Sequence, residues 1–202
     1  MKNYYAALIL VAVDVVLFAI QLSVPGFTDS FLLRSSDAFS RPWILITSVF
    51  LHGGVSHLAG NMFALGLFGL ILEHSIGSKK FLILYFATGI IASFASVFFY
   101  DSALGASGAI FGVLGALAAI RPKMIVWTYG VPMPMFVAAG FWVLLDLIGV
   151  FSPSNVANVA HIAGLAFGVA AGMIMREQEP KEEKSKSTVS DDEFNKWEDE
   201  WM

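Results

Sequence analysis

The sequence contains no cysteine, and only 14% of its 202 residues are charged. Without thiols the chain can form neither disulfides nor thiolate metal sites. It also lacks the His-Glu-x-x-His pattern of zinc proteases. We therefore predict no metal and no other cofactor, and we expect no nucleic-acid partner.

Apolar residues are abundant instead: 57% of the chain is hydrophobic and the mean hydropathy is +0.72, above the range of soluble domains. A membrane span needs about 20 apolar residues, or fewer for a short helix enclosed by others. Six segments qualify, and they predict an all-α, polytopic membrane protein with a six-transmembrane-helix bundle. The segments are 4–24, 57–72, 81–99, 107–120, 135–150 and 156–175.

The chain divides into two parts by composition. Residues 1–176 hold the apolar segments and are predicted to form one transmembrane domain. Residues 177–202 are rich in charge, chiefly acidic, and are predicted to be a disordered cytoplasmic tail without chemistry of its own.

Three features refine the bundle. The fourth span is short and is placed in its middle, where one end can lie below the membrane surface. Asp14 would cost about 3 kcal/mol at the centre of the first span unless it faced the bundle, so we predict that it points inward. Residues 43–51 are apolar but too short to cross, which favours an interfacial element anchored by Arg41 and Trp43.

Most basic residues follow the even-numbered spans, and by the positive-inside rule this puts both termini in the cytoplasm. The starts of spans two, four and six then lie on the outer side. His57, Ser107 and His161 stand near these three ends, so three chemically capable side chains share one depth. The basic residues that carry this prediction are Lys2, Lys79, Lys80, Arg121, Lys123 and Arg176.

A serine and a histidine are the candidate reacting pair. Each begins a helix that carries a ridge of small residues, and facing ridges would let the helices approach closely and bring Ser107 within hydrogen-bond reach of His161. A purely structural role remains an alternative for each: the hydroxyl can bond to a carbonyl one turn back, and the imidazole can be a buried group that is hydrogen-bonded to a carbonyl. No acidic residue stands near His161 in sequence, so we expect a dyad. The ridges are Gly108, Gly112 and Ala116, and Gly164, Gly168 and Gly172.

The second span begins with a histidine and an asparagine at i and i+4. This spacing places His57 and Asn61 on one helix face, where both can donate hydrogen bonds to a developing oxyanion. The alternative is that Asn61 only bonds across helices.

Together these residues resemble the rhomboid family of intramembrane serine proteases. The resemblance covers about residues 5–175, and its motifs occur in the family's order and at similar spacing. They are Arg41-Pro42-Trp43, Phe50-Leu51-His52-Gly53, His57-x-x-x-Asn61, Glu73-x-x-x-Gly77-Ser78, Gly105-Ala106-Ser107-Gly108 and Ala160-His161-x-x-Gly164.

The resemblance implies a serine endopeptidase that cleaves transmembrane segments of other membrane proteins in an outward-opening cavity. It implies Ser107 as the nucleophile, His161 as the general base, and an oxyanion hole of His57, Asn61 and the backbone amide of Ser107. Gly105 would keep the backbone clear for the substrate. Phe111 stands where many family members have a tyrosine stacked on the histidine. His52 and Glu73 would be structural.

Two other functions are compatible with a polytopic membrane protein. A catalytically inactive, client-binding relative is disfavoured because Ser107 and His161 are both present. A small transporter using Asp14 and Asp146 as intramembrane carboxylates is disfavoured because no internal repeat is evident. The partners we expect are transmembrane substrates and the lipid bilayer, in the cell membrane of a prokaryote; the sequence makes no prediction of the oligomeric state.

Overall fold

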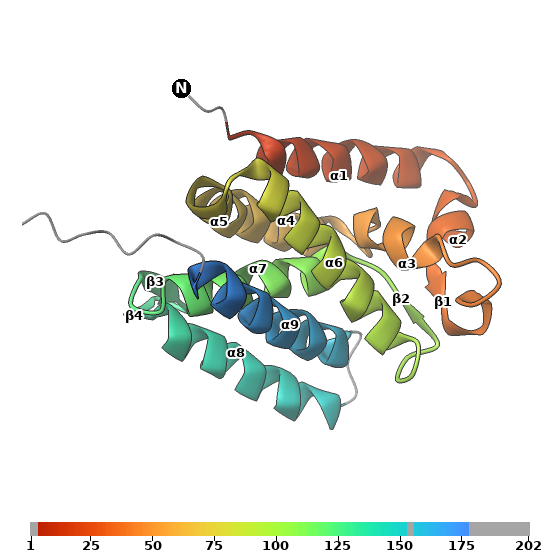
Figure 1. The fold of residues 1–202 in the computed structure, drawn as a ribbon. Helices are drawn as coiled ribbons and strands as arrows, with labels where there is room; N and C mark the ends of the chain where they lie inside the picture. Colours follow the sequence, from red (N-terminus) through yellow and green to blue (C-terminus); the bar gives the residue numbers. More distant parts are fainter. Residues whose placement is uncertain (1–3, 153–155, 178–202) are drawn as a thin grey trace, which may run out of the picture.

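The computed structural model describes residues 4–152 and 156–177. The predicted tail lies outside the described residues except for its first position. The chain forms a helical bundle with two short β-ribbons (Figure 1), so the all-α expectation is confirmed in its main part. The long helices are α1 (Ala6–Ser23), the continuous stretch of α4 (Val55–Ala64), η3 (Leu65–Gly69) and α5 (Leu70–Ile76), α6 (Ser78–Ser96), α7 (Ser107–Ile120), α8 (Met135–Val150) and α9 (Asn158–Glu177).

The helices match the predicted spans closely. Four are long and apolar enough to cross a membrane, namely α1, the α4–α5 stretch, α6 and α9, while α7 and α8 are apolar but shorter. The α4–α5 stretch runs further than predicted at both ends. Its five-residue π-helical segment η3 faces α1 and α7 with tightly buried side chains, including Leu65.

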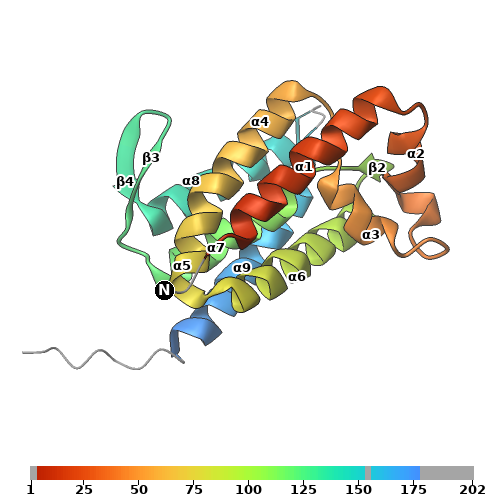
Figure 2. The same ribbon diagram turned by 90° about the horizontal axis from the view of Figure 1, so that it is seen from above.

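Helix α7 occupies the middle of the bundle. Ten of its 14 residues are buried, and α5, α6, α8 and α9 lie around it (Figure 2). A short helix that is enclosed in this way need not match the membrane thickness, because its backbone groups are satisfied internally and its side chains contact protein. The predicted central position of the fourth span is confirmed.

The two ridges of small residues do face each other. A Cβ atom at Gly164 would lie 2.1 Å from the carbonyl oxygen of Gly108, and one at Gly168 would lie 2.0 Å from that of Gly112. These separations leave no room for any side chain at either position. Helices α7 and α9 are therefore packed backbone against backbone, which fixes their relative height as well as their separation.

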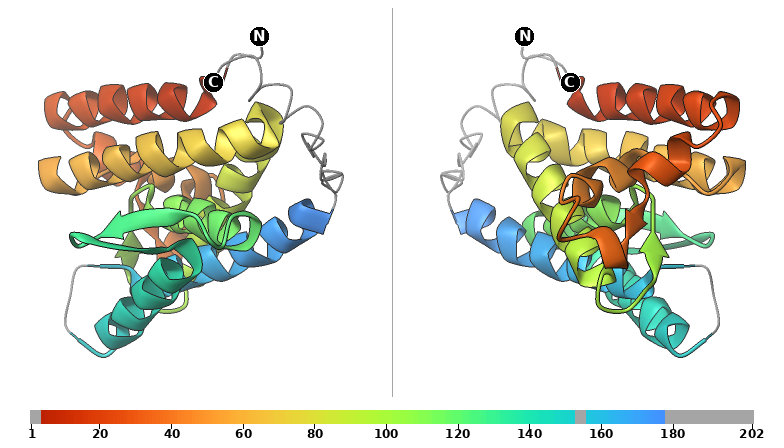
Figure 3. Two further views of the ribbon diagram at one scale, coloured as in Figure 1. Left: turned by 90° about the vertical axis from the view of Figure 1, so that its left-hand side faces the viewer. Right: turned by 90° about the vertical axis from the view of Figure 1, so that its right-hand side faces the viewer.

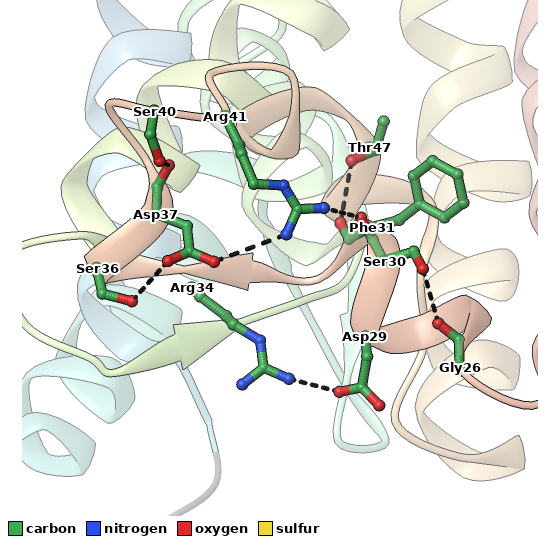
Figure 4. A network of polar contacts seen from close by, with 10 residues as sticks. All are labelled: Gly26, Asp29, Ser30, Phe31, Arg34, Ser36, Asp37, Ser40, Arg41 and Thr47. Atoms are coloured by element: carbon green, nitrogen blue, oxygen red, sulfur yellow. Dashed lines mark hydrogen bonds and ion pairs between the residues drawn. The ribbon is translucent and has the colours of Figure 1, made fainter.

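A long connection between α1 and α4 covers the end of the bundle at which α7 begins. It contains α2 (Phe27–Phe31), β1 (Leu33–Arg34), η1 (Ser35–Asp37), α3 (Ile44–Thr47) and η2 (Ser48–Phe50). Polar contacts hold it in shape (Figure 4): Arg41 pairs with Asp37 and donates to the carbonyl of Ser30, and Arg34 pairs with Asp29. The apolar stretch predicted as an interfacial element is the short helical turn α3–η2.

This connection also reaches the chain just ahead of α7. Strand β1 pairs antiparallel with β2 (Ser102–Ala103), with Leu33 opposite Ala103. The carbonyl of Ser48 accepts a hydrogen bond of 2.9 Å from the amide of Gly105. The segment leading to Ser107 is thus fixed from both sides.

A second ribbon, between α7 and α8, was not expected. Strands β3 (Ile125–Thr128) and β4 (Val131–Pro134) form an antiparallel hairpin that projects beside α8 (Figure 3). Tyr129 in its turn contacts the ring of Phe141 on α8, with centroids 5.8 Å apart.

The acidic residues inside the bundle differ in how they are satisfied. Asp14 points inward as predicted and is fully buried, but neither of its oxygens has a hydrogen-bond partner among the described residues. Glu73, also fully buried, accepts the backbone N–H groups of Ala6 and Ala7 and the hydroxyl of Ser78. It caps the first turn of α1, where a negative charge is favoured by the helix dipole.

Candidate active site

Ser107 is the first residue of α7, and His161 lies in the first turn of α9. The Nε2 atom of His161 is 2.8 Å from the Oγ atom of Ser107, the distance of a good hydrogen bond. The contact exists because the ridges of α7 and α9 set both helix ends at one height. The predicted juxtaposition of these two residues is therefore present in the structure.

The imidazole of His161 is confined on one face as well as at its edges. The ring of Phe111, one turn beyond Ser107 on α7, stacks on it with centroids 4.2 Å apart and planes 9° apart. The predicted stacking is thus present without a tyrosine hydroxyl. It restricts rotation of the imidazole about its Cβ–Cγ bond.

The Ser107–His161 dyad expected from the sequence has an acidic neighbour in the structure. The Nδ1 atom of His161 lies 3.0 Å from the Oδ1 atom of Asp146 on α8. Both side chains are buried. Sequence reasoning missed this contact because the two residues are 15 positions apart. A usable signal was present: α8 and α9 are joined by a short connection, so residues at similar distances from it on either side meet across an antiparallel helix pair.

His57 and Asn61 lie beside the segment that precedes Ser107. Gly105 has φ +121°, a conformation that favours glycine. A Cβ atom added there would lie 2.7 Å from Cε1 and 2.9 Å from Nε2 of His57, and 3.7 Å from Nδ2 of Asn61. The three predicted site residues are therefore close neighbours, and the absence of a side chain at Gly105 is what leaves room for the imidazole.

The hydrogen bonds around His57 define which nitrogen faces the site. The amide of Gly53 donates to its Nδ1 atom at 3.3 Å. In the neutral imidazole the proton then resides on Nε2, so this atom is a donor. The Nδ2 atom of Asn61 is buried and has no hydrogen-bond partner among the described residues. Two side-chain donors thus lie next to Gly105.

A cavity of about 20 Å³ adjoins Ser107, with Ser48, Ser93 and Gly105 in its wall. This volume suffices for one water molecule, and the serine hydroxyls supply polar partners for it. A small, partly open space of mixed polar and apolar lining therefore exists beside the hydroxyl of Ser107.

His52 stands in the connection ahead of α4, at the edge of the His57 ring, with centroids 5.3 Å apart. Its backbone amide and carbonyl bond to the side chain of Gln21 on α1, at 2.9 and 3.3 Å. Burial first, and then the neighbouring His57, lower the pKa of His52 from 6.5 to about 4, against a smaller opposing contribution from the backbone of Phe50. His52 is neutral at physiological pH, and its ring packs against the ring of His57.

Within residues 4–152 and 156–177, no three His, Cys, Asp or Glu side chains are grouped as ligands of one metal ion. The chemically capable groups of the site are a hydroxyl, imidazoles, an amide and a carboxyl.

Comparison with known proteins agrees with this geometry. The Rhomboid domain matches residues 40–178 of this chain. The chain is 42% identical over 134 residues to "Rhomboid protease GluP" of Bacillus subtilis, and this match covers 64% of this chain and 25% of that protein. It is 34% identical over 139 residues to "RHOMBOID-like protein 6, mitochondrial" of Arabidopsis thaliana, covering 67% of this chain and 44% of that protein.

A similar relation holds to "Rhomboid protein 1, mitochondrial" of Saccharomyces cerevisiae, with 30% identity over 161 residues, 72% of this chain and 45% of that protein. The chain thus spans less than half the length of these three curated relatives. The domain match nevertheless covers more than half of the chain and includes Ser107 and His161. On this evidence, the chain is an integral membrane protein of the rhomboid family.

Proposed function

We propose that this rhomboid-family chain is an intramembrane serine endopeptidase that cleaves transmembrane segments of membrane proteins, with Ser107 as the nucleophile and His161 as the general base. The observation that carries the proposal is the 2.8 Å contact between the Oγ and Nε2 atoms of these residues. A base at this distance can accept the hydroxyl proton as the oxygen attacks a carbonyl carbon.

The reaction then follows the two-step course of serine proteases. Oγ attacks the scissile carbonyl while Nε2 of His161 takes the proton, and the resulting imidazolium protonates the leaving amine. This leaves an acyl ester on Ser107. In the second step His161 removes a proton from a water molecule, which releases the acyl group and restores the hydroxyl. The small cavity beside Ser107 is well placed to supply that water.

The oxyanion of each tetrahedral intermediate is stabilised by three donors: Nε2–H of His57, Nδ2–H of Asn61 and the backbone N–H of Ser107. The first two lie against Gly105, two residues before the nucleophile. Neither needs to carry a full charge, and in a water-poor site one such donor contributes about 3 kcal/mol to the transition state. The unused hydrogen-bonding capacity of Asn61 supports this role.

Gly105 and Phe111 are assigned to binding the substrate and shaping the site around it. Gly105 leaves the backbone open for an extended peptide, since any side chain there would collide with His57. Phe111 holds the plane of the His161 ring by stacking. A substrate helix must unwind to expose its carbonyl, so cleavage favours segments with small or helix-breaking residues near one end.

The membrane placement belongs to the same proposal. Both termini lie in the cytoplasm of a prokaryotic cell, and the helix ends that carry Ser107, His57 and His161 open to the outer side. The bias of basic residues toward the opposite loops supports this orientation.

The test is labelling with a fluorophosphonate, together with cleavage of a reporter transmembrane substrate, in the wild type, Ser107→Ala and His161→Ala. Both variants should lose cleavage, and Ser107→Ala should lose labelling. Ser75→Ala and His74→Ala are matched controls at the far end of the α4–α5 stretch, where Ser75 bonds to Ile71 and His74 contacts Tyr4. Cleavage retained in Ser107→Ala would end the proposal, and a folded wild type that neither cleaves nor labels would favour a client-binding role without catalysis.

A further inference from the structure

We propose that Asp146 is a positioning residue for His161, so that the reacting group is a Ser107–His161–Asp146 relay built from three helices. The inference rests on the proposed function. It adds to it a residue on α8 that touches neither the substrate nor Ser107 and acts only through the imidazole.

The contact with Asp146 sets the tautomer of His161. A neutral imidazole has one N–H donor and one acceptor nitrogen, and it can serve as a base toward Ser107 only when Nε2 is the acceptor. A carboxylate cannot donate, so the 3.0 Å contact to Asp146 requires the proton to be on Nδ1. Asp146 thereby selects the form in which Nε2 faces the hydroxyl of Ser107 as an acceptor.

Asp146 is a buried carboxyl with few hydrogen-bond partners. It is 6% exposed, and among the described residues its only hydrogen-bond partner is His161, because its Oδ2 atom has none. A buried carboxyl that serves only the fold is expected to be held by several donors, as Glu73 is by two amides and a hydroxyl. The surroundings of Asp146 therefore fit a carboxyl whose role is to bind the imidazole of His161.

Helices α8 and α9 approach each other closely next to the Asp146–His161 contact. Gly149, three residues after Asp146, meets Asn158, three residues before His161. A Cβ atom on Gly149 would lie 2.6 Å from the Oδ1 atom of Asn158. The two antiparallel helices thus touch at two successive levels, Gly149 with Asn158 and Asp146 with His161. The close approach at the first level brings the carboxyl within reach of Nδ1 at the second.

The consequence for the reaction is electrostatic as well as geometric. When His161 takes the proton of Ser107, the ring becomes an imidazolium, and the carboxylate at 3.0 Å is its counter-charge. The Nδ1 proton stays on the ring throughout. Removing the carboxylate therefore affects the transition state more than substrate binding, which predicts a fall in kcat with little change in KM.

The experiment measures kcat and KM of Asp146→Asn and Asp146→Ser on a reporter transmembrane substrate in lipid vesicles. Asp14→Asn is the matched control, because it makes the same change at another buried aspartate that has no contact with the site. We expect kcat to fall at least about tenfold in each Asp146 variant, with KM and the fraction of fluorophosphonate-reactive molecules within about twofold of wild type. Asp14→Asn should keep the wild-type kcat.

Either Asp146 variant that gives a cooperative unfolding transition decides the matter. A wild-type kcat in that variant would overturn the inference, and so would a loss of activity explained entirely by fewer reactive molecules, which is the mark of a structural role. These outcomes are separate from failure of the proposed function, which appears instead as activity in Ser107→Ala.

Discussion

The hydroxyl of Ser107 and the imidazole of His161 are 2.8 Å apart although 54 positions separate them in the chain. What joins them is not a side chain but the packing of backbone on backbone between α7 and α9. The position of the reacting pair therefore depends on residues one to three turns away that have no chemistry, above all Gly168 and Gly112.

Gly168→Ala tests this dependence. Its new methyl would lie 2.0 Å from the carbonyl oxygen of Gly112, so the helices must separate, at a cost of about 1–3 kcal/mol. We expect a lower unfolding temperature in detergent and slower fluorophosphonate labelling of Ser107. Gly140→Ala on α8 is the control, because nothing lies within 4 Å of its added Cβ. Unchanged labelling in Gly168→Ala would mean that the ridge does not set the geometry of the pair.

Asn61 is the sharpest test of the oxyanion hole. Asn61→Ala removes the Nδ2 donor, and Asn61→Asp removes it at nearly constant volume. Loss of one such donor typically lowers kcat by about 10²–10³-fold, with a smaller effect on KM, because the hydrogen bond is strongest in the transition state. Steady-state kinetics on a reporter substrate measures both constants. If either variant kept kcat within about twofold of wild type, Asn61 would be a structural residue only.

The sequence was sufficient for those parts of the site that depend on one helix or on a pair of matching patterns. The i, i+4 spacing places His57 and Asn61 on one face, and two small-residue ridges predict that α7 meets α9. Both predictions follow from the 3.6-residue period of the α-helix, because residues at this spacing can be recognised in the sequence.

It was insufficient where a tertiary contact changes the meaning of a residue. Glu73 was expected to be structural, and it is, but its acceptor contacts are with the amides of Ala6 and Ala7, which lie 67 and 66 positions away and which no pattern in the sequence identifies. In the sequence, Asp146 suggested only a transporter carboxylate. Its contact with His161 follows from the antiparallel packing of α8 and α9, which the short connection between them indicates but which no periodic pattern around Asp146 reveals.

The cap that Glu73 forms on α1 predicts a loss of stability without loss of chemistry. Glu73→Gln keeps the shape but removes the charge facing two amides and the α1 dipole, at a cost of about 1–3 kcal/mol. The change should appear as a lower unfolding temperature with labelling of Ser107 intact once the sample is folded. Asp29→Asn breaks an exposed ion pair with Arg34 and should cost less, at most about 1 kcal/mol. Equal shifts in the two variants would count against the cap.

His52 predicts a dependence of stability on pH. Its folded pKa is about 4, below the ordinary 6.5. Between these values the unfolded chain binds a proton that the folded protein does not, so stability falls as the pH is lowered through this window, by at most about 3 kcal/mol. Above pH 6.5 the imidazole is neutral in both states and has no such effect.

His52→Gln isolates this contribution, because glutamine does not titrate. We expect the drop in unfolding temperature between pH 7 and pH 5 to be smaller in His52→Gln than in the wild type, measured in the same detergent. His74→Gln, at the far end of the α4–α5 stretch, should keep the wild-type dependence. Identical pH profiles for the wild type and His52→Gln would show that protonation of another group governs acid stability, and that the burial of His52 beside His57 carries no such penalty.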